Sequence, residues 1–177
     1  MLTHSVHLYE RLGSSISEIN FNSENCFPLD FLPVVALLDN TSVEVPSRKK
    51  LVERLNLKPF EILQDHFDLF IKAAEKLKVQ IMDIKFTEEI DQELEEDLNE
   101  SIGNKDYKKV YSFVKEVRLE DIDIFSLTYI HDSISYTITK YAVAEFIGDS
   151  NKIPEIIIQS PLSFIAGLKK FPSSLFN

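Results

Sequence analysis

Residues 87–102 hold the densest group of ionisable side chains in this sequence. The segment contains eight carboxylates and no basic residue. Carboxylates at this density can attract a cation or a basic surface, and such attraction also accelerates association. We call this group the acidic cluster; its members are Glu88, Glu89, Asp91, Glu93, Glu95, Glu96, Asp97 and Glu100.

The acidity of the chain is concentrated in this cluster. The 177 residues include 29 acidic and 19 basic side chains, which gives a formal charge of -10. Without the cluster, 21 acidic side chains would remain against the same 19 basic ones. A local concentration of charge is a candidate binding surface, so we expect a basic partner for it.

A second interpretation of the cluster is structural. Ile90, Leu94, Leu98 and Ile102 recur every four residues, which predicts a helix with one narrow apolar line. The helix expected next, Lys105–Arg118, carries a net charge of +3. In an antiparallel helical hairpin its cations could lie beside the carboxylates, so the cluster is either an open acidic face or a solvated, internally paired one. A calcium loop is not expected, because such a loop has a central glycine and Gly103 follows the cluster instead.

The histidines suggest a different chemistry. His131-Asp132 resembles the adjacent His-Asp pair of metal-dependent phosphohydrolases, in which an upstream His and a downstream Asp complete the site; His66 and Asp149 stand in those positions. The match covers two residues, and its predicted setting is a turn between strands. His4 and His7 have no Cys or acidic motif beside them, so no zinc site is predicted.

Residues 47–78 suggest a helix-turn-helix. Ser47 is expected to cap a helix through Asn56, and Pro59 to open a second one after a tight junction. This is also the most basic part of the chain, with Arg48, Lys49, Lys50, Arg54 and Lys58. The second helix would bring Glu61, Asp65 and Asp68 towards DNA phosphates, which would repel them.

The sequence lacks the residues that several classes of protein function require. The chain has four glycines and no glycine-rich phosphate loop, nucleophile elbow or Cys-x-x-Cys pair, so we predict no catalytic residue, cofactor or bound metal. Cys26 is the only cysteine and is expected to be a reduced thiol. The N-terminus is unlike a signal peptide, and the apolar stretches Leu29–Leu38 and Ile156–Leu168 are too short to span a bilayer.

The expected helices follow from apolar spacing and capping residues. A short apolar helix is expected over Leu29–Leu38, and Asp39–Ser42 would end it. The best helical pattern follows Pro59, where apolar residues from Phe60 to Leu77 fall three and four apart. A last helix is expected over Leu162–Lys170.

Strands are expected where the period changes to two. Val79–Phe86 alternates, and Ile122–Ile130 and Ile134–Ile147 are rich in β-branched and aromatic residues, with His131-Asp132-Ser133 as a hairpin turn. One long helix over the last two segments is the competing interpretation. Glu155–Gln159 is a further strand candidate, and His4–Leu12 fits either a helix or a strand.

These elements predict an α+β, helix-rich fold. It would be a single globular domain over residues 1–177, with N-terminal helices and a helical hairpin packed with a small antiparallel sheet from the C-terminal half. We expect a cytoplasmic protein that does not associate with a membrane, and its acidity argues against direct nucleic-acid binding.

The leading functional hypothesis is a non-enzymatic acidic protein-binding module. It would act as immunity proteins, antitoxins and inhibitors of nucleic-acid enzymes do, by placing carboxylates against a basic surface of a protein partner. A DNA-binding regulator that uses residues 47–78 is the first alternative. A metal-dependent phosphohydrolase around His131-Asp132 is the second.

Overall fold

The chain divides into two compact units in a computed structural model. Unit 1 comprises Met1–Glu61 and Tyr141–Asn177, and unit 2 comprises Ile62–Lys140. The structure describes residues 2–12, 26–29, 34–38, 45–148, 152, 156–157 and 161. The polar loop expected over Ser14–Asn25, the helix end at Asp39–Ser42 and the helix over Leu162–Lys170 lie outside these residues, as does most of Glu155–Gln159. The expectation of a single domain stays a prediction.

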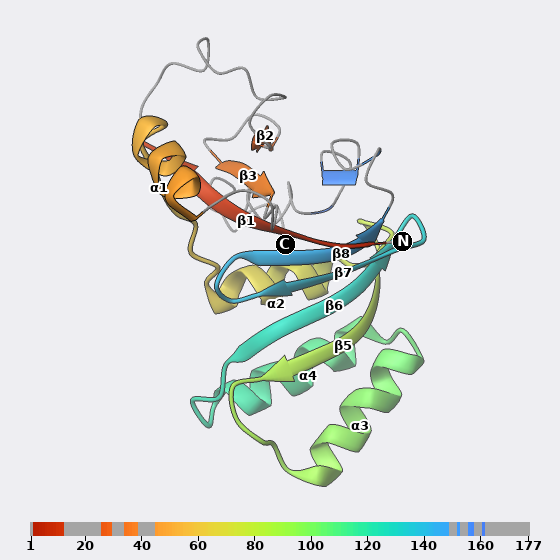
Figure 1. Cartoon of the computed structure of the whole chain (residues 1–177). Helices are drawn as coiled ribbons and strands as arrows, with labels where there is room; N and C mark the ends of the chain where they lie inside the picture. The colour runs from red at the N-terminus through yellow and green to blue at the C-terminus, as the bar shows by residue number, and fades with distance from the viewer. Residues whose placement is uncertain are drawn as a thin grey trace. The chain divides into compact units, whose positions relative to one another are not determined.

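Unit 1 is built around a long strand, β1 (Leu2–Arg11). β1 pairs antiparallel with β3 (Val34–Leu38), β8 (Val143–Gly148) and the short β4 (Leu57–Pro59), and β2 (Cys26–Pro28) pairs with β3 (Figure 1). Helix α1 (Val45–Arg54) packs its apolar face on these strands. The buried contact there joins Val35, Leu37, Leu55 and Leu57, with Leu51 and Val52 partly buried beside them.

The helix expected over Leu29–Leu38 is wrong, because its second half is strand β3. Val34, Val35, Ala36 and Leu37 are all buried, so both faces of the strand are apolar. A short apolar run of this kind has the same pattern whether it is a buried strand or a buried helix. The adjoining helix α1 begins at Val45, so Ser47 lies inside it rather than at its N-cap.

Unit 2 contributes three neighbouring antiparallel strands and three helices. β5 (Gln80–Phe86) pairs with β6 (Ile124–His131), and β6 pairs with β7 (Ile134–Thr139). Residues 122–147 therefore form strands, as predicted, and not the single long helix of the competing interpretation. The second segment is divided, however, because β7 ends at Thr139 and β8 begins at Val143.

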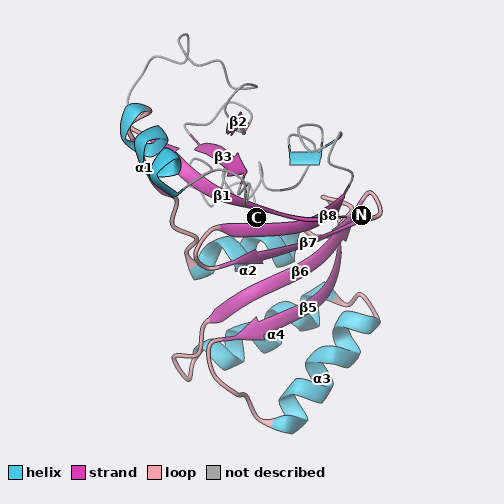
Figure 2. Ribbon diagram, viewed as in Figure 1, coloured by secondary structure: helices cyan, strands magenta, loops and turns pink. Residues whose placement is uncertain are grey.

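The helices of unit 2 are α2 (Gln64–Ala73), α3 (Gln92–Gly103) and α4 (Tyr107–Arg118), which Figure 2 shows in cyan. α2 packs on β6 through the rings of Phe70 and Tyr129, whose centroids are 4.9 Å apart. α3 and α4 form the expected hairpin. α4 faces the core with Val110, Val114 and Val117, all of which are buried.

The predicted fold class is wrong in the size and origin of its sheet. The described residues contain eight strands and four helices. Strands β1 to β4 come from the N-terminal third, where helices were expected except at His4–Leu12, which fitted either a helix or a strand and belongs to β1. The sheet is therefore not small, and it is not confined to the C-terminal half. For β3 the reason is that a strand buried on both faces loses the alternation that identifies a strand in sequence.

Candidate functional site

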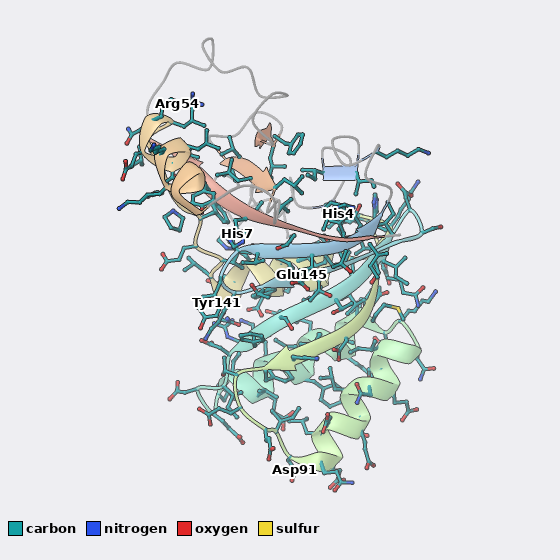
Figure 3. All side chains as sticks on the ribbon, in the orientation of Figure 1. His4, His7, Arg54, Asp91, Tyr141 and Glu145 are labelled. Carbon is teal, nitrogen blue, oxygen red and sulfur yellow. The ribbon has the colours of Figure 1, made fainter. Side chains whose placement is uncertain are left out.

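The acidic cluster lies on α3 and on the segment that leads into it. Asp91 is the N-cap, and its side chain accepts hydrogen bonds from the backbone N–H of Glu93 at 2.9 Å and of Leu94 at 3.4 Å (Figure 3). Glu93 and Glu95 follow in the first turn, where the helix dipole favours negative charge. The carboxylates of Glu93 and Glu95 therefore stabilise the first turn of α3. Glu88 and Glu89 precede the helix.

The apolar line of α3 holds the helix to unit 2, as the spacing predicts. Leu98 and Ile102 are 2% and 6% exposed, and Leu94 is half-buried. A narrow apolar line buries one face and leaves the rest of the helix to solvent. All members of the acidic cluster are exposed.

The carboxylates of the cluster have no basic partner among the residues that the structure describes. Within the described part of the chain, none of them forms an ion pair with Lys or Arg. Among the described residues, the one hydrogen bond between two side chains in the cluster region joins Gln92 Nε2 to Glu96 Oε1, at 2.9 Å. Among the described residues, the internally paired interpretation of the cluster therefore has no ion pair to support it.

Two cations of α4, Lys115 and Arg118, contact α2 instead. Lys115 Nζ lies 2.7 Å from Asp68 Oδ2, and Arg118 contacts both Asp68 and Asp65. The Asp68 side chain is 6% exposed, and its hydrogen bond raises the pKa of Lys115. These contacts join α4 to α2, so Lys115 and Arg118 do not neutralise α3.

A depression of about 200 Å³ adjoins the cluster, between the end of α3 and the start of α4. It contains two members of the cluster, together with one cation and one aromatic ring. The lining residues are Asp97, Glu100, Ser101, Asn104, Asp106, Lys109 and Phe113. Asp106 caps α4 by accepting a hydrogen bond from the backbone N–H of Lys109 at 3.2 Å.

Sequence reasoning found the two cluster members in this depression, and its paired alternative placed cations of the next helix, including Lys109, beside them. It missed the other four residues. Ser101 and Phe113 carry no recognisable motif. The helix expected from Lys105 begins two residues later, at Tyr107, because Lys105 adopts a left-handed conformation (φ 57°), and Asp106 is the N-cap. The signal that could have located the depression is the short connection between an acidic and a basic helix.

The His131-Asp132 pair lies in a tight hairpin turn. Asp132 and Ser133 both have positive φ angles, 47° and 66°, as the mirror-image turns of two-residue hairpins require. His131 Nδ1 lies 3.5 Å from Asp132 Oδ2. His66 accepts a hydrogen bond at Nδ1 from the backbone N–H of Leu63 and so closes the first turn of α2. Asp149 lies outside the described residues, among which no group of His, Cys, Asp and Glu could hold a metal ion.

Residues 47–78 do not form the predicted pair of adjacent helices. Pro59 belongs to strand β4, which pairs with β1, and α2 begins only at Gln64. A helix-turn-helix needs a turn of three or four residues between its helices. Here residues 55–63, with a strand among them, separate α1 from α2. Lys58 also pairs with Glu10, at 3.1 Å.

Comparison with known proteins adds no relative. No family, no curated protein and no solved structure matches the chain. Among the described helices, none combines the length and the apolar character that crossing a membrane requires.

Proposed function

We propose that this chain is a non-enzymatic acidic protein-binding module that engages a basic surface of a protein partner, in the manner of an inhibitor, immunity protein or antitoxin. The partner would be of the kind that binds polyanions, such as a nucleic-acid enzyme. The observation that carries the proposal is the exposure of the whole acidic cluster without an ion pair among the described residues.

The distribution of charge supports the same proposal. Unit 2 carries 18 acidic and 10 basic side chains, so most of the net charge of the chain resides in this unit. Two of those bases, Lys115 and Arg118, are engaged by Asp68. A concentrated field of one sign raises the association rate with a surface of the opposite sign, and added salt weakens it.

The proposal is tested by reversing charge in the cluster without touching the depression. The variant combines Glu88→Lys, Glu89→Lys and Glu96→Lys, all at exposed positions away from the buried line of α3. Affinity capture from the host lysate at low salt should retain basic proteins on the wild type, and high salt should release them. The reversed variant should lose those proteins, because its cluster no longer opposes their charge.

A matched control separates the cluster from net charge. Glu53→Lys, Glu61→Lys and Glu120→Lys change the formal charge by the same amount at exposed positions outside the cluster. This variant should retain the captured proteins, and neither variant should unfold below the wild-type temperature. If the two variants lose the same proteins to the same extent, net charge alone explains the binding and the proposal fails.

A further inference from the structure

The first turn of α2 is closed by a histidine. The backbone N–H of Leu63, the N-cap residue, donates to Nδ1 of His66 at 2.9 Å, and the backbone N–H of His66 donates to the carbonyl oxygen of Leu63, also at 2.9 Å. This reciprocal pair has the pattern of a capping box, in which Glu or Gln usually takes the place of the histidine. A side chain that titrates near neutral pH therefore occupies a capping position.

The turn depends on this histidine because the N-cap residue has no acceptor in its own side chain. Leu63 is apolar, whereas α3 and α4 begin with the capping carboxylates of Asp91 and Asp106. Backbone N–H groups at the start of a helix have no partner within the helix, so a side chain must supply one. In α2 that side chain is His66.

The hydrogen bond also fixes the protonation state of His66. Nδ1 can accept a hydrogen bond only through its lone pair, so the closed turn requires a neutral ring that carries its proton on Nε2. A proton on Nδ1 would place two donors against each other and break the bond. The residue is 5% exposed and lies at the positive end of the helix dipole, and both features make a positive charge on the ring costly.

On the side of the sheet, the ionisable groups opposite α2 are phenols. His66 shares a face of α2 with Phe70, four residues later, and Phe70 packs on Tyr129 of β6. Burial raises the pKa of Tyr129 well above its usual value, and burial raises the pKa of Tyr136 on β7 to about 12. Both phenols are therefore neutral at and below neutral pH, and neither would stabilise a charged imidazole.

On the other side, charged groups of α4 contact α2. Arg118 contacts the carboxylates of Asp65 and Asp68, and Lys115 contacts that of Asp68. Two cations thus stand against two carboxylates along this side of α2. The pairs leave no net negative charge there that would favour an added proton on His66.

The same turn fastens α2 to the start of β6. Gln64 accepts the backbone N–H of Ile124 at Oε1, at 2.8 Å, and donates from Nε2 to the carbonyl oxygen of Ile124, at 3.0 Å. The preceding residue, Asp123, bonds through its backbone N–H to Oγ1 of Thr87 at 3.2 Å. Opening the first turn of α2 would displace Gln64 and so release the backbone of Ile124.

We propose that His66 is a pH-sensitive cap, which holds the first turn of α2 and the start of β6 together at neutral pH and releases them on acidification. A solvated histidine binds a proton below about pH 6.5. The open turn can take this proton at Nδ1 whereas the closed turn cannot, so the equilibrium moves towards the open turn as pH falls. The cap goes beyond the proposed binding function, because it uses no residue of the acidic cluster.

Amide hydrogen exchange of the full chain, followed by NMR at about pH 7.5 and about pH 5, tests the cap. After correction for the intrinsic effect of pH on exchange, the protection of the Leu63 and Ile124 amides should fall by up to about 30-fold at the lower pH. The amide of Lys109 is the internal control. It lies at the start of α4, where an aspartate and not a histidine is the cap, and should keep its protection.

Three variants separate the cap from a general sensitivity to acid. His66→Gln keeps an acceptor that a capping box prefers and cannot titrate, so Leu63 and Ile124 should stay protected at both pH values. His66→Leu removes the acceptor, so both amides should exchange faster than in the wild type at neutral pH and show no further pH dependence. His131→Gln removes a histidine of the β6–β7 turn and should keep the wild-type profile.

The same measurements can overturn the cap. Protection of Leu63 that is equal at the two pH values would do so, and so would a fall of the wild-type size in the His66→Gln variant, which has no ring to protonate. Nitrogen-15 spectra of the histidine rings check the protonation state directly. Nδ1 of His66 should be unprotonated at neutral pH, and a proton found there would mean that the Leu63 bond does not form in solution.

Discussion

The hydroxyl of Tyr129 lies in the core of unit 2 without a hydrogen-bond partner among the described residues. The residue is 0% exposed, and its ring stacks on that of Tyr136 with centroids 5.2 Å apart. An unsatisfied buried hydroxyl costs free energy, whereas the ring itself contributes packing. Burial, followed by the proximity of Tyr136, raises the pKa of Tyr129 well above its usual value of 10.0.

Replacing this tyrosine should therefore have an effect that depends on pH. Near pH 7, Tyr129→Phe should leave the free energy of unfolding unchanged or raise it by up to about 1 kcal/mol. Above about pH 10 the unfolded wild-type chain ionises at this position while the folded chain does not, so the wild type loses stability as pH rises. The phenylalanine variant cannot ionise there, and its advantage should grow by up to about 1.4 kcal/mol per pH unit.

Urea unfolding of both proteins near pH 7 and at about pH 11 measures this difference. The comparison cancels the titration of lysines, which both proteins share. A loss of more than about 1 kcal/mol at pH 7 in the variant would mean that the hydroxyl does have a partner in solution.

At the scale of elements, Asp68 joins α2 to α4. Its Oδ2 forms ion pairs with Lys115 and Arg118 of α4, while its Oδ1 has no partner among the described residues. Asp68→Asn should lower the free energy of unfolding by about 1–3 kcal/mol, because a buried charged acceptor is lost. Asp65→Asn on the same helix is the control. Its side chain is 77% exposed and also faces Arg118, so it should cost less than about 1 kcal/mol.

A double-mutant cycle between Asp68→Asn and Lys115→Met would apportion this contact. A coupling energy near zero would mean that the ion pair does not stabilise the packing of α4 on α2. In that case the lysine would remain available to neutralise other carboxylates, and the isolation of the acidic cluster would need another cause.

The elements that could be predicted from the sequence are those with one buried face. The alternation in Ile134–Thr139 and the four-residue spacing from Ile90 to Ile102 both identified their elements, because each pattern has one period. Buried segments such as β3 have no such contrast. The strand β4 was hidden for another reason, since Pro59 resembles the first residue of a helix and instead lies in a strand that pairs with β1.

Turns were equally hard to place, because this chain rarely uses glycine where the backbone becomes left-handed. Seven other residues adopt a positive φ among those described, including Asn56 after α1 and Lys105 after α3. Glycine is the residue that marks such positions in a sequence. Its scarcity here leaves most of these turns unmarked in the sequence, because the structure makes them with other residues.

At the scale of the whole molecule, the acidic cluster is an electrostatic cost to the free protein. Within α3, Glu93 and Asp97, and likewise Glu96 and Glu100, lie four residues apart on the helix surface. Like charges at this spacing destabilise a helix by about 0.2–0.5 kcal/mol per pair. No ion pair offsets them among the described residues. A surface that lowers stability is easier to explain by binding than by scaffolding.

Stability should therefore rise with ionic strength. Raising NaCl from about 0.02 to 0.5 M at neutral pH shortens the Debye length below the distances between exposed charges, and the unfolding temperature should increase. The buried Asp68 contacts are screened much less and should oppose this rise only weakly. Calorimetry at a series of salt concentrations measures the slope.

The variant that combines Glu88→Lys, Glu89→Lys and Glu96→Lys should show a flatter slope and a higher unfolding temperature at low salt. A wild-type unfolding temperature that falls with salt would mean that attraction outweighs repulsion in the free protein, and the cluster would then be part of its scaffold.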